Sequence, residues 1–178
     1  MRDFKPNAAG LLVPDNKLGM GGSFHAELIR ADKVVDEWDF DNIVVNEGLN
    51  SALNVIFSGA SQITAWYIGL FSGNYTPIPA DTGATIAANS TEFSGYVAGV
   101  RQAFTTVSST AQLITNTASK ASFVFTGGAT LYGAFLASSS TINGTTGALM
   151  SAARFPAART VYAADQLLLT YAFAASSV

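Results

Sequence analysis

The sequence contains no cysteine, so disulfide bonds, thiolate nucleophiles and thiolate metal sites are all excluded. It has a single histidine, His25, and no G-x-S-x-G turn, which leaves little from which to build a Ser-His-Asp triad. EF-hand, H-E-x-x-H and P-loop motifs are also missing. We therefore expect a protein that is not an enzyme and that needs no cofactor or metal.

Charged residues are scarce, at 12% of the chain against a usual share of about 25%. The 9 Lys and Arg residues form no cluster and the net charge is −3, so we expect no nucleic-acid partner. No run of about 18 apolar residues is present, which predicts no membrane span. The first ten residues, MRDFKPNAAG, lack the apolar core of a secretory signal, so we expect synthesis in the cytoplasm.

Apolar residues are abundant by contrast, at 49% of the 178 residues. A monomer with so few charges would struggle to cover its surface with polar groups, so we expect much of that surface to be buried against other proteins. The charges are also unevenly spread, because 14 of the 21 precede position 48. This predicts a solvated N-terminal section and a nearly neutral body that is either core or interface.

Residues 1–22 are predicted to form an extended N-terminal arm, and residues 23–178 a single domain. The arm is interrupted by residues that break helices and long strands, namely Pro6, Gly10, Pro14, Gly19, Gly21 and Gly22. Such an arm would either lie across a neighbouring subunit or remain a loose terminus.

The rest of the chain has the pattern of short strands separated by turn residues. Residues 23–40 predict a hairpin that turns at Ala31 and Asp32. Further strands are expected at 42–45, 65–71, 102–107, 120–126, 130–137, 149–155 and 166–173, with a tight hairpin at Gly127 and Gly128. Two long loops are expected, at 73–89 and 138–147. The pattern predicts an all-β fold, an antiparallel β-sandwich or jelly roll.

One short α-helix is expected at about residues 47–58. Asn46 is a suitable N-cap and Gly59 a natural stop. The apolar residues between them recur at helical spacing and define one face, comprising Leu49, Ala52, Leu53, Ile56 and Phe57. Because so short a helix is marginal alone, we expect packing to hold it in place.

Two groups of side chains suggest binding sites, each with a simpler alternative. The dense acidic group of Asp36, Glu37, Asp39 and Asp41 predicts either a weak calcium site or, as we prefer, a solvated hairpin. The aromatic residues of the strands suggest either a carbohydrate groove or, as we prefer, core packing. These aromatic residues are Trp66, Tyr67, Tyr96, Tyr132, Tyr162 and Tyr171.

Isolated charges in the neutral body are candidates for subunit contacts. Arg101 and Asp165 each precede an apolar strand, where a charge has to be exposed, paired or placed at an interface. We predict that Arg101, Arg154 or Arg159 makes an intersubunit ion pair, and we include Asp165 among the interface residues.

Several stretches together carry a resemblance to a known class of protein. They are residues 42–50 (NIVVNEGLN), 66–71 (WYIGLF), 133–136 (GAFL), 147–155 (GALMSAARF) and 165–171 (DQLLLTY). In this order the sequence resembles small structural proteins of tailed-bacteriophage virions, over roughly residues 20–175. The motifs mark a fold and carry no catalytic residues.

The resemblance implies a β-sandwich or jelly-roll protein on the capsid surface of the virion, made in the host cytoplasm. A capsid cement (decoration) protein is the expected role, with a dimer or trimer that binds the major capsid protein between its subunits. Many weak contacts on a fixed lattice would add up through effective concentration. A tail- or fibre-associated component, or a module that binds host glycans, is the alternative. The glycan alternative needs exposed aromatic residues in the loops 73–89 or 138–147, where Tyr75 is the only one.

Overall fold

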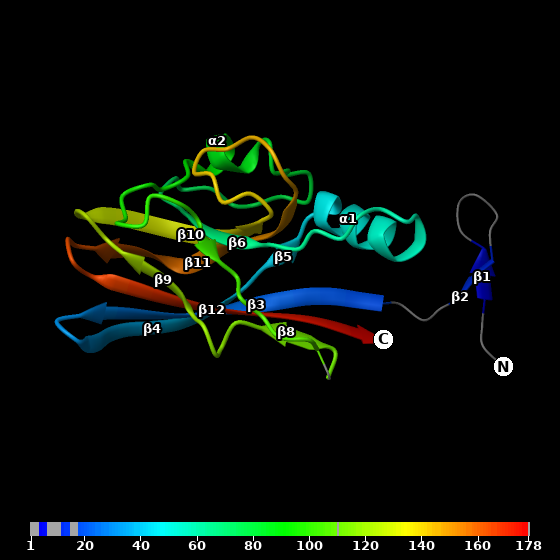
Figure 1. The fold of residues 1–178 in the computed structure, drawn as a ribbon, viewed down its shortest axis with the longest axis horizontal. Coiled ribbons are helices and arrows are strands. Elements are labelled where there is room, and N and C mark those ends of the chain that lie inside the picture. The colour runs from blue at the N-terminus through cyan, green and yellow to red at the C-terminus, as the bar shows by residue number, and fades with distance from the viewer. Residues whose placement is uncertain (1–3, 7–11, 15–17, 110, 178) are drawn as a thin grey trace.

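The computed structural model describes residues 4–6, 12–14, 18–109 and 111–177, and most of them form a β-sandwich of two antiparallel sheets (Figure 1). The predicted sandwich is therefore confirmed. One sheet, here called the outer sheet, has the order β4-β3-β12-β8, with β9 also paired to β12. Its strands are β3 (Leu18–Arg30), β4 (Lys33–Asp41), β8 (Leu113–Thr115), β9 (Ala121–Val124) and β12 (Gln166–Ser177).

The second sheet, here called the inner sheet, has the order β5-β11-β10-β6-β7. Its strands are β5 (Ile43–Val44), β6 (Tyr67–Phe71), β7 (Gln102–Ala103), β10 (Ala129–Ala137) and β11 (Leu149–Val161). A short helix, α2 (Ile86–Ser90), and long loops cover the face of this sheet that points away from the outer sheet (Figure 1). The inner sheet is therefore buried on both faces, which explains why residues 68–71 are apolar without alternation.

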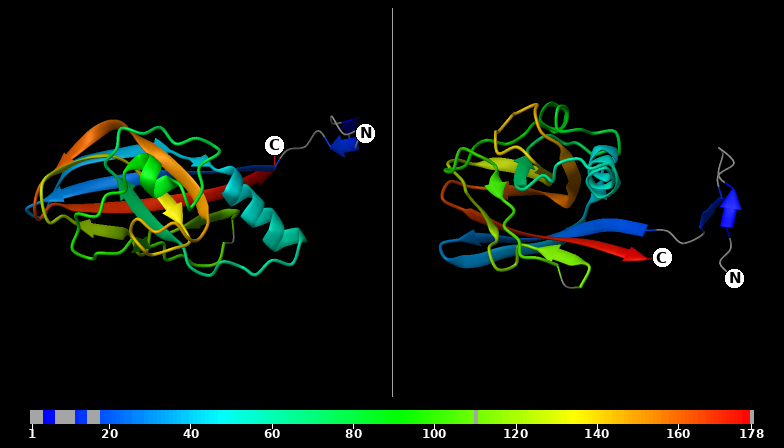
Figure 2. Two further views of the ribbon diagram at one scale, coloured as in Figure 1. Left: turned by 90° about the horizontal axis from the view of Figure 1, so that it is seen from above. Right: turned by 45° about the vertical axis from the view of Figure 1, so that its right-hand side comes forward.

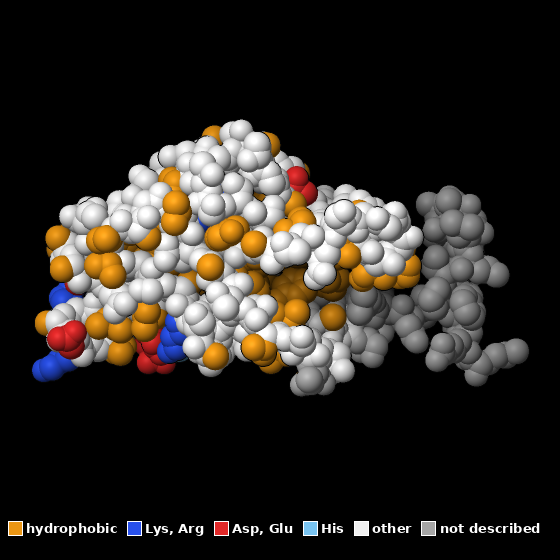
Figure 3. Space-filling model, in the orientation of Figure 1, with side chains coloured by type: hydrophobic (Ala, Val, Ile, Leu, Met, Phe, Trp, Pro, Cys, Tyr) orange, Lys and Arg blue, Asp and Glu red, His pale blue; other side chains and the backbone are white. Residues whose placement is uncertain are grey.

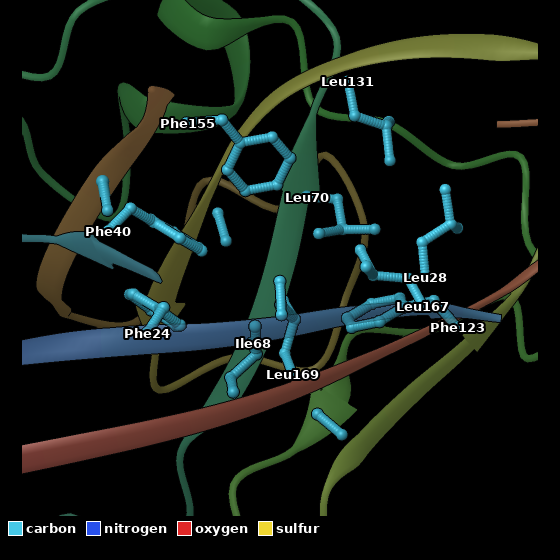
Figure 4. Close-up of a cluster of buried hydrophobic side chains, with 14 of the residues drawn as sticks. Phe24, Leu28, Phe40, Ile68, Leu70, Phe123, Leu131, Phe155, Leu167 and Leu169 are labelled. Carbon is cyan, nitrogen blue, oxygen red and sulfur yellow. The ribbon is translucent and has the colours of Figure 1, made fainter. Parts of the chain in front are cut away.

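The main core lies between the two sheets (Figure 4). The outer sheet contributes Phe24, Leu28 and Leu169, whose neighbours in sequence point to the opposite, more polar face. The inner sheet contributes Ile68 and Leu70, both fully buried. A second, smaller cluster lies on the other face of the inner sheet and contains Val45, Phe71, Ile86, Phe135, Ala137, Leu149 and Ala152.

The β3–β4 hairpin turns at Ala31 and Asp32 as predicted, and both residues have positive φ angles of 48° and 61°. This pair of left-handed residues fits the right-handed twist of the two strands. The expected hairpin at Gly127 and Gly128 is wrong, because β9 pairs with β12 while β10 pairs with β6 and β11. The glycines instead join the two sheets, and Phe123 and Phe125 fill the core beside this crossing.

The predicted helix is α1 (Asn46–Phe57), but its expected cap is wrong. Asn46 is already helical, Val45 occupies the N-cap position, and no side chain caps the first turn. The Glu47 side chain instead accepts hydrogen bonds from two residues outside the helix, the backbone N–H groups of Gly83 and Leu149, at 2.7 Å each. These two bonds attach the start of α1 to a loop and to β11.

The region predicted as an arm is described in part. Phe4–Pro6 (β1) and Leu12–Pro14 (β2) pair with each other and with no other strand of the described chain. Leu18–Gly22, at the end of the expected arm, instead belong to β3 and pair with β12. The remainder of residues 1–17 lies outside the described residues.

Candidate interaction surface

Arg101, the first predicted interface residue, is buried inside one chain. Its guanidinium donates two hydrogen bonds to Glu92, at 2.7 and 2.8 Å, and both side chains are fully buried. Arg101 also donates to the Ser139 carbonyl, and Glu92 accepts the Asn143 N–H. The pair therefore holds the 138–147 loop against the body, and Arg101 has no surface to offer a partner. Its expected intersubunit ion pair is corrected to an intrachain one.

Asp165 likewise makes its ion pair within the chain. Arg30 donates two hydrogen bonds to its carboxylate, at 2.8 and 2.7 Å, and Asp165 is 2% exposed. The Arg30 guanidinium, with the Tyr162 N–H, lowers the pKa of Asp165 from its ordinary value despite its burial. Arg30 also lies over the ring of Tyr162, so the pair closes the β11–β12 turn. Asp165 is therefore a turn residue and not an interface residue.

The other two predicted arginines keep part of their side chains at the surface. Arg159 pairs with Asp36 at 2.9 Å and lies over the ring of Trp38. Arg154 donates to the Tyr75 carbonyl at 3.2 Å. Both make contacts inside the chain but remain only half-buried, so their intersubunit role stays a prediction.

The acidic group of β4 faces solvent together with His25 of β3. His25 Nδ1 lies 2.8 Å from Asp39, and its Nε2 lies 3.4 Å from Glu37 and 3.5 Å from Glu27. The hydrogen bond to Asp39, followed by the charges of the neighbouring carboxylates, raises the pKa of His25. Lys120 pairs with Glu27 at 2.8 Å. Within the described chain no group of three or more His, Asp or Glu residues has metal-binding geometry.

The loop that could present an aromatic residue to a glycan turns that residue inward. The Tyr75 hydroxyl donates to Asp81 at 2.7 Å, and Tyr75 packs against the smaller core cluster. Asp81, 1% exposed, also accepts the Ile78 N–H and the Asn89 amide. Of the aromatic residues considered for a carbohydrate groove, Tyr96 and Tyr171 are buried in the main core. Burial raises the pKa of both hydroxyls.

An apolar groove lies between α1 and the outer sheet. This groove has a volume of about 470 Å³, and it is lined by α1 and the segment after it and by residues of β3, β8, β10, β11 and β12. Among its lining residues are Met20, Ala52, Ile56, Trp66, Phe104 and Phe173. Figure 3 shows it as a hollow with hydrophobic side chains beneath α1. At this end the core of the sandwich is open.

The rim of the groove is also apolar, because α1 leaves much of its apolar face uncovered. Leu53, Ile56 and Phe57 are 49%, 62% and 79% exposed. Only the first turn of the helix is held closely: Gly48 is buried, and a β-carbon there would lie 2.5 Å from the Met150 carbonyl oxygen. The expectation that packing holds the helix is therefore correct for its first turn and wrong for its second half.

Sequence reasoning missed this groove although the helical spacing of its apolar residues was visible. The spacing identifies an apolar face but does not say whether the same chain covers it. The signal that could have helped is the low charge of the chain beside that face.

Comparison with known proteins gives no family: no protein-family model matches the chain, and no curated protein matches it. Among the described helices, none is both long and apolar enough to cross a membrane.

Proposed function

We propose that the protein is a structural subunit that works by packing against copies of itself and its neighbours in a larger particle. The observation that carries this proposal is the open apolar groove with its exposed rim on α1. Single exposed apolar residues are ordinary, but a contiguous apolar surface around an open core marks an interaction site. In a chain with only 12% charged residues, association is the simplest way to cover it.

The particle that we propose is the virion of a tailed bacteriophage. The resemblance of residues 20–175 to small virion proteins supports this choice. Within the virion we propose a capsid cement role, with a dimer or trimer that joins subunits of the major capsid protein at the capsid surface. Such a protein needs a rigid body, and the sandwich with its buried Arg101–Glu92 pair supplies one.

The test is a cryo-electron microscopy map of the phage that encodes this chain. Density for the sandwich that bridges major capsid subunits would support the cement role. Density at the tail or its fibres would reject it in favour of the tail-associated alternative. A particle without the chain would overturn the proposal altogether.

The glycan-binding alternative is weaker, because Tyr75 donates its hydroxyl to Asp81 instead of facing solvent. An array of host-surface glycans tested against the purified protein would revive this alternative if binding were saturable and lost on alteration of the 73–89 loop.

A further inference from the structure

We infer that two copies of the chain pair reciprocally, with residues 61–65 of each copy lying along a row of amide side chains on α1 of the other copy. The row consists of Asn46, Asn50 and Asn54. This inference rests on the proposed self-association and names the surface that performs it.

The amide row lines a polar groove beside α1, here called the amide groove. The groove has a volume of about 580 Å³. Asn46, Asn50 and Asn54 follow one another at intervals of four residues, so their side chains share one face of the helix. All three are exposed, and within the described chain their side chains make no hydrogen bond, whereas the buried Asn116 amide both donates and accepts. The row therefore offers donors and acceptors to a partner.

The amide groove offers no free charge to a ligand. Glu47 and Asp81 line it, but both carboxylates already accept hydrogen bonds from the chain itself, and Asp81 is 1% exposed. No Lys or Arg is among the lining residues, and no aromatic ring is there on which a sugar could stack. An uncharged ligand that both donates and accepts, such as a polypeptide main chain, therefore fits this groove better than an ion or a sugar.

Residues 61–65, here called the return segment, supply such a main chain. They run back from the end of α1 toward β6, with no charged residue and no regular secondary structure (Figures 1 and 2). Among the described residues, the backbone N–H and C=O groups of this segment have no hydrogen-bond partner. An unpaired row of backbone groups is a template for pairing with another chain.

The spacing of the amide row suits the return segment. Residues four apart in a helix are separated by about 6 Å along its axis, and alternate residues of an extended chain are separated by about 6.5 Å. Successive amides of the row can therefore reach alternate peptide groups of one extended segment. Each amide can donate to a backbone carbonyl and accept from a backbone N–H.

A second copy is the partner because each chain carries both halves of this contact and joins them nowhere within itself. Ser61 and Ile63 of the return segment line the amide groove, so the two halves lie beside each other. A twofold axis through the groove would place the return segment of each copy on the amide row of the other, as in an isologous dimer. Gln62, Ile63 and Thr64 also line the apolar groove, which makes the contact continuous with the open end of the sandwich.

The absence of cysteine allows a direct test in the full-length protein. One preparation carries Asn50→Cys in the amide row, and a second, mass-tagged preparation carries Ser61→Cys in the return segment. The matched control replaces Ser61→Cys by Ser119→Cys, because Ser119 is also exposed but lies in the turn between β8 and β9. Each pair is mixed under mild oxidation, and mixed disulfide dimers are counted by mass.

We expect the Asn50→Cys and Ser61→Cys pair to give at least about ten times more mixed dimer than the control pair, since a disulfide needs α-carbons within about 7 Å. Equal yields would overturn the inference.

A second measurement removes the amides without harming the helix. Asn50→Ala with Asn54→Ala places the best helix-forming residue at both positions, so the fold should be kept. We expect sedimentation to show a dimer dissociation constant at least about ten times higher than that of the wild type. Asn74→Ala, at an exposed loop residue outside the amide groove, should change it less than about twofold.

An unchanged dissociation constant in the double variant, or a wild-type trimer, would overturn the reciprocal contact and leave self-association through another surface in place. Because both measurements use isolated protein, a dimer with the expected cross-link that is absent from the virion would reject only the proposed function.

Discussion

The two ends of the sandwich differ in how the core is separated from solvent. At the charged end, defined by the β3–β4 turn and the Arg30–Asp165 and Arg159–Asp36 pairs, polar groups close the core from solvent. At the open end, defined by α1 and the groove beneath it, the core reaches the surface without a charged residue among the groove's lining residues. On the face drawn in Figure 3, most of the visible acidic and basic side chains lie toward the end opposite α1. This difference between the two ends is the reason that we propose the open end as the interaction surface.

We expect the largest difference in stability when the same substitution, phenylalanine to alanine, is made once in the closed core and once at the open end. Phe155→Ala removes a ring that is 2% exposed and lies against Trp38 and Phe40, with centroids 5.3 and 4.8 Å away. We expect it to lower the free energy of unfolding by about 3–5 kcal/mol. Phe57→Ala at the open end should change it by less than about 0.5 kcal/mol, because that ring is 79% exposed.

Urea denaturation of both variants, at a protein concentration low enough to keep the chain monomeric, measures the two values. A large loss in Phe57→Ala would show that the rim of the groove is part of the monomer's own core. The contrast between closed and open regions would then be wrong.

The buried Arg101–Glu92 pair tests whether the closed region depends on its internal charges. Arg101→Met leaves the Glu92 carboxylate buried without its partner, and we expect a loss of about 3–5 kcal/mol. Adding Glu92→Leu removes the stranded charge and should recover part of that loss. Thermal unfolding of the single and double variants gives the comparison, and a single variant as stable as the wild type would contradict the intrachain pairing.

Gly48 tests how α1 is attached at the open end. A methyl group at this position meets the Met150 backbone, so Gly48→Ala should push the first turn of α1 from β11 and cost about 1–3 kcal/mol. Gly127→Ala is the matched control, because nothing lies within 4 Å of its added β-carbon. Equal stability of the two variants in chemical denaturation would show that α1 is not held by this contact.

The smallest effect concerns the charged face of the outer sheet. Because the pKa of His25 is raised above its ordinary value of 6.5, its contribution is fully present below that pH and is lost as the pH rises through the folded-state pKa. Between about pH 6 and about pH 9 we expect a loss of less than about 1 kcal/mol. His25→Gln should remove this part of the pH dependence, and an unchanged pH profile in that variant would refute the His25–Asp39 interaction.

Local patterns predicted much of the fold because they depend on neighbours in sequence. The turn at Ala31 and Asp32 and the apolar strand at 68–71 are of this kind. The hairpin at Gly127 and Gly128 failed because strand pairing depends on the whole core: β9 and β10 lie in different sheets. The short helix α2 was missed at the end of the expected 73–89 loop, where buried Asp81 accepts hydrogen bonds from the Ile78 N–H and the Asn89 amide.

The candidate site was less predictable than the fold. A lone charge in an apolar body indicates a partner but not whether that partner is in the same chain. Arg101 pairs with Glu92, which lies 9 residues away in sequence. Asp165 pairs with Arg30, which lies 135 residues away. The groove depends on the gap between α1 and the outer sheet, which no local pattern encodes.

The most direct test of the central claim is the oligomeric state of the purified chain by sedimentation velocity. We expect the wild-type protein to sediment as a dimer or trimer, and a variant with Ile56→Glu and Phe57→Glu at the open end to sediment as a monomer. A control with Val34→Glu and Val35→Glu on β4, where both residues are also exposed, should keep the wild-type state. A wild-type chain that stays monomeric at high concentration, or open-end and control variants that behave alike, would contradict assembly through the open end.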